Sequence, residues 1–136
     1  MDSSRSVMQM SICILVIAES LGAIENFTNL LASHSSFEHN IFVAANVEQA
    51  ITLANLAQFD VVITHLPAME MGAFESIVQL KCALQAKPIL VISDAEEHAL
   101  IAQAIRRLSE GFIAHRDLSS ELLIQAIQSA IETKSA

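Results

Sequence analysis

FDVVITHLPAMEMG, the segment from Phe59 to Gly72, decides how the rest of the chain is interpreted. Its apolar run from Val61 to Ile63 predicts a strand that is buried on both faces, as strands of parallel sheets are. The run ends at Thr64 and His65. Ligands of open α/β sheets bind beyond the carboxyl ends of the strands, so these two residues stand where a functional group is expected.

Short apolar runs and helix-period segments alternate along the rest of the chain. Apolar residues spaced three or four apart indicate helices, whereas short continuous apolar runs indicate buried strands. We predict strands at 11–18, 41–44, 59–65, 89–93 and 112–114, separated by helices at 21–31, 47–58, 73–85, 95–109 and 120–132. Asn46 and Asp94 are predicted helix N-caps, and Gly111 is predicted to end the fourth helix as a C′ glycine.

Alternating strands and helices with short connections form a parallel sheet with helices on both faces. The predicted fold class is therefore α/β, a doubly wound parallel sheet of (βα)5 units with flavodoxin-like topology and strand order 2-1-3-4-5. A chain of 136 residues fits one domain. We predict a flexible N-terminal tail at residues 1–10 and a single domain at residues 11–136.

Composition limits the partners that this domain can have. The formal net charge of −8 argues against direct nucleic-acid binding, because phosphates are neutralised by clustered Lys and Arg. No run reaches the roughly 18 apolar residues that cross a membrane, so we expect no membrane association. The apolar run from Ser11 could pass for a signal peptide, but its removal would delete the first strand, and we expect it to be retained. Cys13 and Cys82 are expected to be reduced core thiols, which favours a cytoplasmic location.

Four segments resemble, in order and spacing, the motifs of receiver domains, the signal-accepting domains of two-component response regulators. CILVIAES resembles the first strand and acidic pocket, FDVVITH the third strand and phosphoacceptor, KPILVISDA the fourth strand and switch hydroxyl, and GFIAHRDLSSELLIQAI the fifth strand, lysine region and last helix. The resemblance covers Ser11 to Lys134 and is closest to receivers of regulators with a helix-turn-helix output domain. It implies the receiver topology.

The resemblance also implies a set of groups that an active receiver needs. Two acidic residues hold Mg²⁺, an Asp accepts the phosphoryl group, and a hydroxyl and a Lys bind the phosphoryl oxygens. The acid pair falls on Ala18 and Glu19, so one carboxylate is lost. The phosphoacceptor position falls on His65, or on Thr64 if the shortened loop shifts the register.

The remaining positions fit in part. By the same resemblance, Ser93 is the switch hydroxyl and Phe112 the switch aromatic, whereas His115 stands at the lysine position. Asp60 starts its strand, roughly 16 Å from the pocket at about 3.3 Å per residue, and cannot replace the missing acid. Asp94 follows Ser93, but we interpret it as a helix cap rather than as a metal ligand.

The chemistry of these residues predicts a pseudo-receiver, a receiver fold without the phosphotransfer site. Neither Thr64 nor His65 can form an acyl phosphate, and Glu19 alone is a poor site for Mg²⁺, which takes several oxygen ligands. We predict no catalytic residue, no metal and no cofactor, and therefore no enzyme. The expected function is protein–protein interaction independent of aspartyl phosphorylation, as in the input domain of a transcription regulator.

The last two helices carry more apolar residues than one core stripe needs. Leu100, Arg107, Leu122 and Ile124 are the exposed candidates for an interface with a protein partner or a second copy, formed by these helices and the fifth strand. Exposed leucines are also common on ordinary surfaces, and both interpretations remain open.

An alternative function rests on the histidines. His65, His115 and Glu19 could form a two-His-one-carboxylate pocket that binds a metal or small ligand, or that is phosphorylated unconventionally. In the other interpretation, which we favour, the two histidines replace the Asp–Lys charge pair of an active receiver with a neutral, hydrogen-bonded pair.

Overall fold

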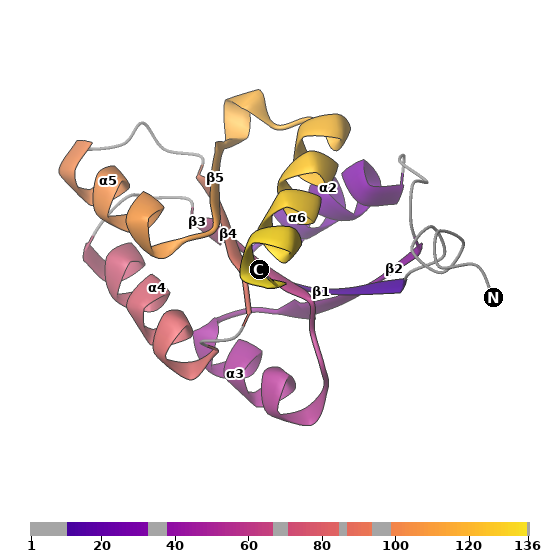
Figure 1. Ribbon diagram of the computed structural model, residues 1–136, viewed down its shortest axis with the longest axis horizontal. Helices are drawn as coiled ribbons and strands as arrows, with labels where there is room; N and C mark the ends of the chain where they lie inside the picture. The colour runs from indigo at the N-terminus through magenta and orange to yellow at the C-terminus, as the bar shows by residue number, and fades with distance from the viewer. Residues whose placement is uncertain (1–10, 33–37, 67–70, 85–86, 94–98, 136) are drawn as a thin grey trace.

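The computed structural model describes residues 11–32, 38–66, 71–84, 87–93 and 99–135. Strands and helices alternate along the chain as predicted (Figure 1). In order they are β1 (Ser11–Ile17), α2 (Leu21–Ala32), β2 (Glu38–Ala44), α3 (Val47–Leu56), β3 (Val61–Leu66), α4 (Met71–Ala83), β4 (Ile89–Ser93), α5 (Ala99–Leu108), β5 (Gly111–Ala114), the short 3-10 helix η1 (His115–Asp117) and α6 (Ser120–Ser135).

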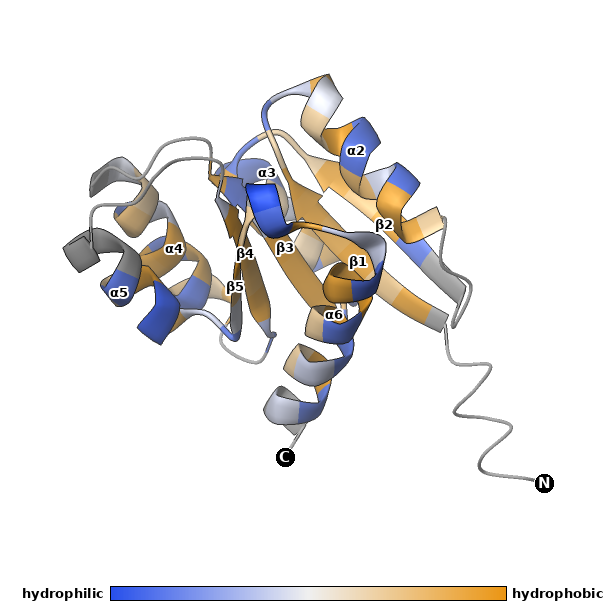
Figure 2. Ribbon diagram, turned by 90° about the horizontal axis from the view of Figure 1, so that it is seen from above, coloured by the Kyte–Doolittle hydropathy of each residue, from blue (hydrophilic) through white to orange (hydrophobic). Residues whose placement is uncertain are grey.

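The five strands form one parallel sheet in the order β2-β1-β3-β4-β5, which confirms the predicted fold class and topology. Two helices, α2 and α6, cover one face, and α3, α4 and α5 cover the other (Figure 1). Figure 2 shows the hydrophobic strands enclosed between these two helix layers. None of the helices in the described ranges is long and apolar enough to cross a membrane.

The side chains of β3 alternate between two hydrophobic cores. Val61 and Ile63 belong to the core under α2 and α6, together with Phe27 and Ile127. Val62 belongs to the core under α3, α4 and α5. A central parallel strand must be apolar on both faces for this reason, and the unbroken run Val61 to Ile63 satisfies that requirement.

Polar side chains cap the start of helices α3 and α6, and Asn46 does so as predicted. Asn46 caps α3, because its Oδ1 accepts a hydrogen bond of 2.8 Å from Gln49 N. The hydroxyl of Ser119 accepts a hydrogen bond of 3.1 Å from Leu122 N at the start of α6. The predicted cap Asp94 lies outside the described residues.

Three local predictions are wrong. Gly111 does not end α5 in a left-handed conformation, because no described residue has a positive φ and Gly111 is the first residue of β5. The glycine serves close packing instead, since a Cβ there would overlap the side chain of Leu90. Cys82 is exposed on α4 rather than in the core, although both Cys13 and Cys82 are free thiols. Strand β2 begins at Glu38, three residues before the predicted start.

Candidate functional site

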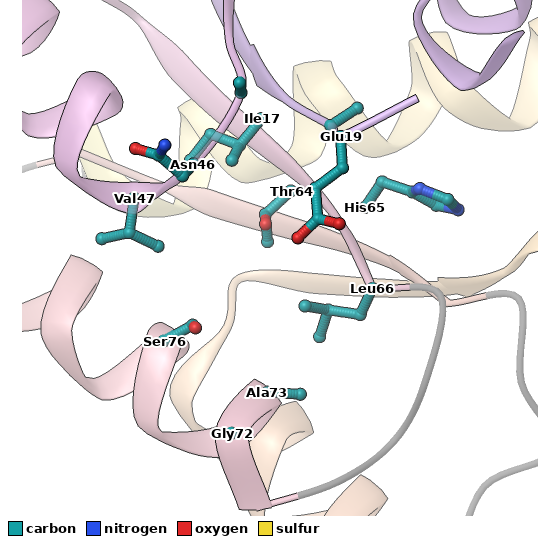
Figure 3. A pocket seen from close by; sticks show the side chains of 12 residues that line it. Ile17, Glu19, Asn46, Val47, Thr64, His65, Leu66, Gly72, Ala73 and Ser76 are labelled. Atoms are coloured by element: carbon teal, nitrogen blue, oxygen red, sulfur yellow. The ribbon is translucent and has the colours of Figure 1, made fainter. Parts of the chain in front are cut away.

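A cavity of about 370 Å³ opens at the carboxyl ends of β1 and β3 (Figure 3). This is the switch point of the strand order, where open α/β sheets bind their ligands. Its walls come from the end of β1, the β2–α3 connection, the end of β3 and the first turns of α4. The lining residues are Ile17, Ala18, Glu19, Ala45, Asn46, Val47, Thr64, His65, Leu66, Gly72, Ala73 and Ser76.

The strand register brings most of the predicted pocket residues to one edge of the sheet. Ile17 pairs with Thr64, so Ala18 and Glu19 follow at the same level as the end of β3. Ser93 pairs with Leu66, and His115 follows directly after Ala114, the residue paired with Ser93. The side chain of His115 lies outside what the structure describes.

Thr64 and His65 point to opposite faces of the sheet. Thr64 is 2% exposed and lies on the face of Val62 and Leu66, beneath α3 and α4. The His65 ring contacts Phe27 of α2 edge to face, with ring centroids 5.7 Å apart and an interplanar angle of 72°. Figure 3 shows this ring extending away from Asn46 and Ser76. His65, one of the two residues predicted for the phosphoacceptor position, therefore packs against α2.

The acidic part of the pocket is reduced to one side chain. Ala18, which the resemblance predicts to stand at an acid position, is 2% exposed and belongs to the core under α2 and α6. Glu19 is exposed, and its carboxylate points into the cavity (Figure 3). Glu19 is the only acidic residue among the described residues that line the cavity.

Asp60 lies at the other end of β3, as predicted. Its carboxylate accepts a hydrogen bond of 2.9 Å from Cys13 N, and its own N–H donates to Cys13 O at 2.9 Å. The carboxylate thus ties the amino end of β3 to β1. It cannot supply the acid that is missing from the carboxyl edge.

Ser93 carries a buried hydroxyl without a hydrogen-bond partner in the described structure. The residue is 3% exposed and pairs with Leu66 across the β3–β4 ladder. Buried polar atoms are nearly always hydrogen bonded in folded proteins, and an exception needs an explanation. The sequence identified Ser93 by resemblance, but it could not show that this hydroxyl is unpaired.

Two polar contributors to the cavity were missed by the sequence analysis. Asn46 was recognised only as a helix cap, yet it lines the cavity from the start of α3, and Ser76 lines it from α4. A signal existed for Asn46, because the connection after β2 reaches the same sheet edge as β1 and β3. Among the described side chains no three His, Cys, Asp or Glu form a group that could hold a metal ion.

The predicted interface lies beside this pocket, on α5, β5 and α6. The guanidinium of Arg106 lies 4.7 Å from the centroid of the Phe112 ring. A second hollow, of about 230 Å³, is lined by Arg106, Phe112, Ile113, Ala114, Arg116, Asp117 and Leu122. Leu122 is 36% exposed and Arg107 is exposed, as predicted. The side chain of Leu100 lies outside the described residues.

The prediction that Ile124 is exposed is wrong. Ile124 is 3% exposed and packs in the core with Leu123 and Ile127. Residues three apart lie on the same side of a helix, which places Ile124 with Ile127. The apolar stripe of a core-facing helix is more than about 100° wide, so it accommodates both 123 and 124.

The chain is similar to solved structures of receiver domains. The signal receiver domain of a modulated diguanylate cyclase from Desulfovibrio desulfuricans G20 is 20% identical over 93% of this chain and 98% of that chain, with a TM-score of 0.73. A LuxR-family two-component response regulator from Aurantimonas sp. SI85-9A1 is 17% identical over 91% of this chain and 87% of that chain, with a TM-score of 0.73. The signal receiver domain of an HD domain-containing protein from Pseudomonas fluorescens Pf-5 is 18% identical over 93% of this chain and 98% of that chain, with a TM-score of 0.73.

Likeness at these identities establishes the fold: the chain has the α/β receiver fold that its strand order indicates. No family model matches the chain, and no curated protein matches it.

Proposed function

We propose that this chain is a pseudo-receiver, a signalling domain that acts through protein–protein interaction without aspartyl phosphorylation. The observation that carries the proposal is the packing of the His65 ring against Phe27 at the phosphoacceptor position. The neighbouring acid position is filled by the buried methyl group of Ala18. Ala18 belongs to the core under α2, and the His65 ring contacts Phe27 of that core, where an active receiver would present carboxylates.

The chemistry of phosphoryl transfer supports the same proposal. An acyl phosphate requires a carboxylate nucleophile, and its transition state requires a metal and a cation to offset charge. The cavity offers the single carboxylate of Glu19, whereas Mg²⁺ binds to several oxygen ligands in near-octahedral geometry. His115 replaces the cationic lysine.

The partner surface that we propose is the face of α5, β5 and α6. Arg106 and Arg116 line the hollow on this face, and Arg107 is exposed on α5, in a chain with only 7 Lys and Arg and a net charge of −8. Phe112 and Leu122 supply apolar contact area beside them. An acidic partner with an apolar anchor has the complementary chemistry. One similar structure is a LuxR-family response regulator, which supports a role as the input domain of a transcription regulator.

The absence of aspartyl phosphorylation is tested by intact-mass spectrometry after incubation with acetyl phosphate and Mg²⁺. We expect no added phosphoryl mass, while a phosphorylatable receiver treated in parallel gains one. The His65→Ala variant is the matched control for phosphohistidine. A phosphoryl mass on the wild type that disappears in His65→Ala would overturn the proposal, and so would a hydroxylamine-labile acyl phosphate on any residue.

The partner surface is tested by the affinity for a partner captured by crosslinking in cells that produce the full-length protein. Leu122→Glu should weaken binding by about tenfold or more, because burying one Leu side chain contributes roughly 1.5–3 kcal/mol. Arg107→Glu should also weaken binding, because it places a negative charge opposite an acidic partner. Leu56→Glu is the matched control, since Leu56 is 78% exposed at the end of α3, on another face. Equal effects of Leu122→Glu and Leu56→Glu would contradict this surface.

A second candidate function is a ligand sensor at the cavity beside Glu19. The cavity volume of about 370 Å³ and the polar groups of Asn46, Thr64 and Ser76 favour it. The carboxylate of Glu19 selects against anions, so a cationic ligand is the class to test. Amide spectra titrated with butylammonium, pentanol and valerate should shift around Glu19 for the ammonium alone. Equal shifts with all three compounds would exclude charge-based recognition.

A further inference from the structure

Strand β2 forms one edge of the sheet and is paired on one side only, with β1, within the described part of the chain. Edge strands of soluble proteins usually carry Lys, Pro or a bulge that blocks further pairing. The sequence of β2, EHNIFVA, contains no Lys or Pro, its register with β1 is unbroken, and its one charged residue, Glu38, stands at its start. Phe42 is 42% exposed and Val43 is 40% exposed, so the edge is apolar on both of its faces.

The direction of the backbone groups of β2 follows from one hydrogen bond. Ala18 N donates to Ala44 O at 3.0 Å, so the peptide groups of Ala44 face β1. Successive residues of a strand direct their N–H and C=O groups to opposite sides, so the backbone N–H and C=O groups of Phe42 also face β1. The N–H and C=O groups of Ile41 and Val43 therefore point outward from the sheet edge. They form a row to which another strand can bind.

We propose that this edge binds a second copy of the chain, with the two β2 strands antiparallel about a two-fold axis at Phe42. The two sheets then join into one continuous sheet. In this register Ile41 lies opposite Val43 of the second copy, and their outward N–H and C=O groups form hydrogen-bonded pairs. Phe42 lies opposite its own counterpart in a non-hydrogen-bonded pair, which matches the inward direction of its backbone groups.

Side-chain complementarity selects this register. Ile41 and Val43 share the sheet face covered by α2, because they pair with Ile14 and Val16 of β1. The pairing buries an apolar Ile–Val contact twice on that face. On the other face, Phe42 already contacts Phe59 edge to face at 5.3 Å, and its counterpart extends this aromatic group. A shift by two residues would place Asn40 opposite Phe42.

Charge within β2 does not oppose the pairing, although each chain carries a net charge of −8. The one acidic residue of β2 is Glu38, at its start. In the proposed register the two Glu38 positions are about 26 Å apart at about 3.3 Å per residue. That separation is well beyond the screening length of about 8 Å at physiological ionic strength.

The symmetry of this contact limits the assembly to a dimer. The same edge of each copy is used, so the interface is isologous and closed. The opposite edge of the sheet is the shorter strand β5, of 4 residues.

Sedimentation velocity of the wild type from about 10 μM to 1 mM, a range typical of weak interfaces, is the first test. We expect a monomer–dimer equilibrium. Val43→Lys should raise the dimer Kd by about tenfold or more, because each dimer would bring two lysines into a strand pair. Val78→Lys on α4 is the matched control, since Val78 is 37% exposed, and it should leave the Kd unchanged. A wild type that stays monomeric throughout, or equal effects of both variants, would overturn the proposal.

Disulfide trapping tests the register. Cβ atoms of a directly opposed antiparallel pair lie about 4.5–5.5 Å apart, close enough for a disulfide after small adjustment. In a Cys82→Ser background, which removes the exposed native thiol, Phe42→Cys should form a crosslinked dimer under mild oxidation. Val78→Cys in the same background should stay monomeric. Absence of the crosslink in Phe42→Cys, or equal crosslinking in both variants, would reject this register.

Discussion

The sheet uses acidic side chains differently at the two ends of its strands, which we call the amino edge, where the strands begin, and the carboxyl edge, where they end. At the amino edge the carboxylates of Asp60 and Glu110 accept hydrogen bonds from backbone N–H groups of neighbouring strands, at 2.9 Å from Cys13 and 2.8 Å from Ile89. At the carboxyl edge, Glu19 is exposed over a cavity and the Ser93 hydroxyl is buried without a described partner. Polar groups connect the strands at the amino ends, whereas at the carboxyl ends the side chains of Glu19 and Ser93 make no hydrogen bond within the described residues.

Glu110 shows how the amino edge is closed. Its carboxylate accepts hydrogen bonds from Ile89 N and from Lys81 Nζ, the latter at 3.0 Å. Its own N–H donates to Ile89 O at 2.9 Å. The side chains of Lys81 and Glu110 are 21% and 13% exposed, so solvent weakens this pair less than a surface pair. One carboxylate therefore connects α4, β4 and the turn before β5.

The largest change in the free energy of unfolding is expected at the amino edge, from substitution of Glu110. Glu110→Ala should lower the free energy of unfolding by about 3 kcal/mol, because it removes charge-assisted hydrogen bonds and leaves the Ile89 N–H with no acceptor. Urea denaturation followed by circular dichroism measures the change. Glu75→Ala, at an exposed position on α4, is the control and should change stability by less than about 0.5 kcal/mol. Similar values for the two variants would show that the amino edge is not closed by Glu110.

At the carboxyl edge, removal of a polar group should stabilise the fold rather than destabilise it. Ser93→Ala removes a buried hydroxyl that has no described partner, so it should raise the free energy of unfolding by about 1 kcal/mol. Ser120→Ala is the same substitution at a satisfied site, since the Ser120 hydroxyl donates to Leu30 O at 2.6 Å. It should lower stability by about 1 kcal/mol. A loss of stability in Ser93→Ala would mean that the hydroxyl has a structural partner, and the contrast between the edges would fail there.

The sequence predicts the sheet better than it predicts the site. Strand order, the cap Asn46 and the edge on which Glu19 and Ser93 lie all follow from periodicity, turn residues and topology. The directions of Thr64 and His65 do not, because the preceding run is apolar on every position and so gives no sign of which face belongs to which helices. Ile124 was misplaced because two adjacent positions fit within one helix stripe, and only packing decides between them.

The smallest expected effect compares the carboxylates of the two edges directly. Glu19→Gln should change the free energy of unfolding by less than about 0.5 kcal/mol, because the side chain is exposed and the fold does not depend on its charge. Asp60→Asn, which replaces a charged acceptor with a neutral one at the Cys13 N–H, should cost about 1 kcal/mol. Both substitutions remove one negative charge and no heavy atom, so they match in size and in net charge. Thermal and urea unfolding of the two variants at equal ionic strength measure the difference. If Glu19→Gln lowers the free energy of unfolding as much as Asp60→Asn does, then Glu19 stabilises the fold, and its exposure would no longer support a role in binding a ligand or partner.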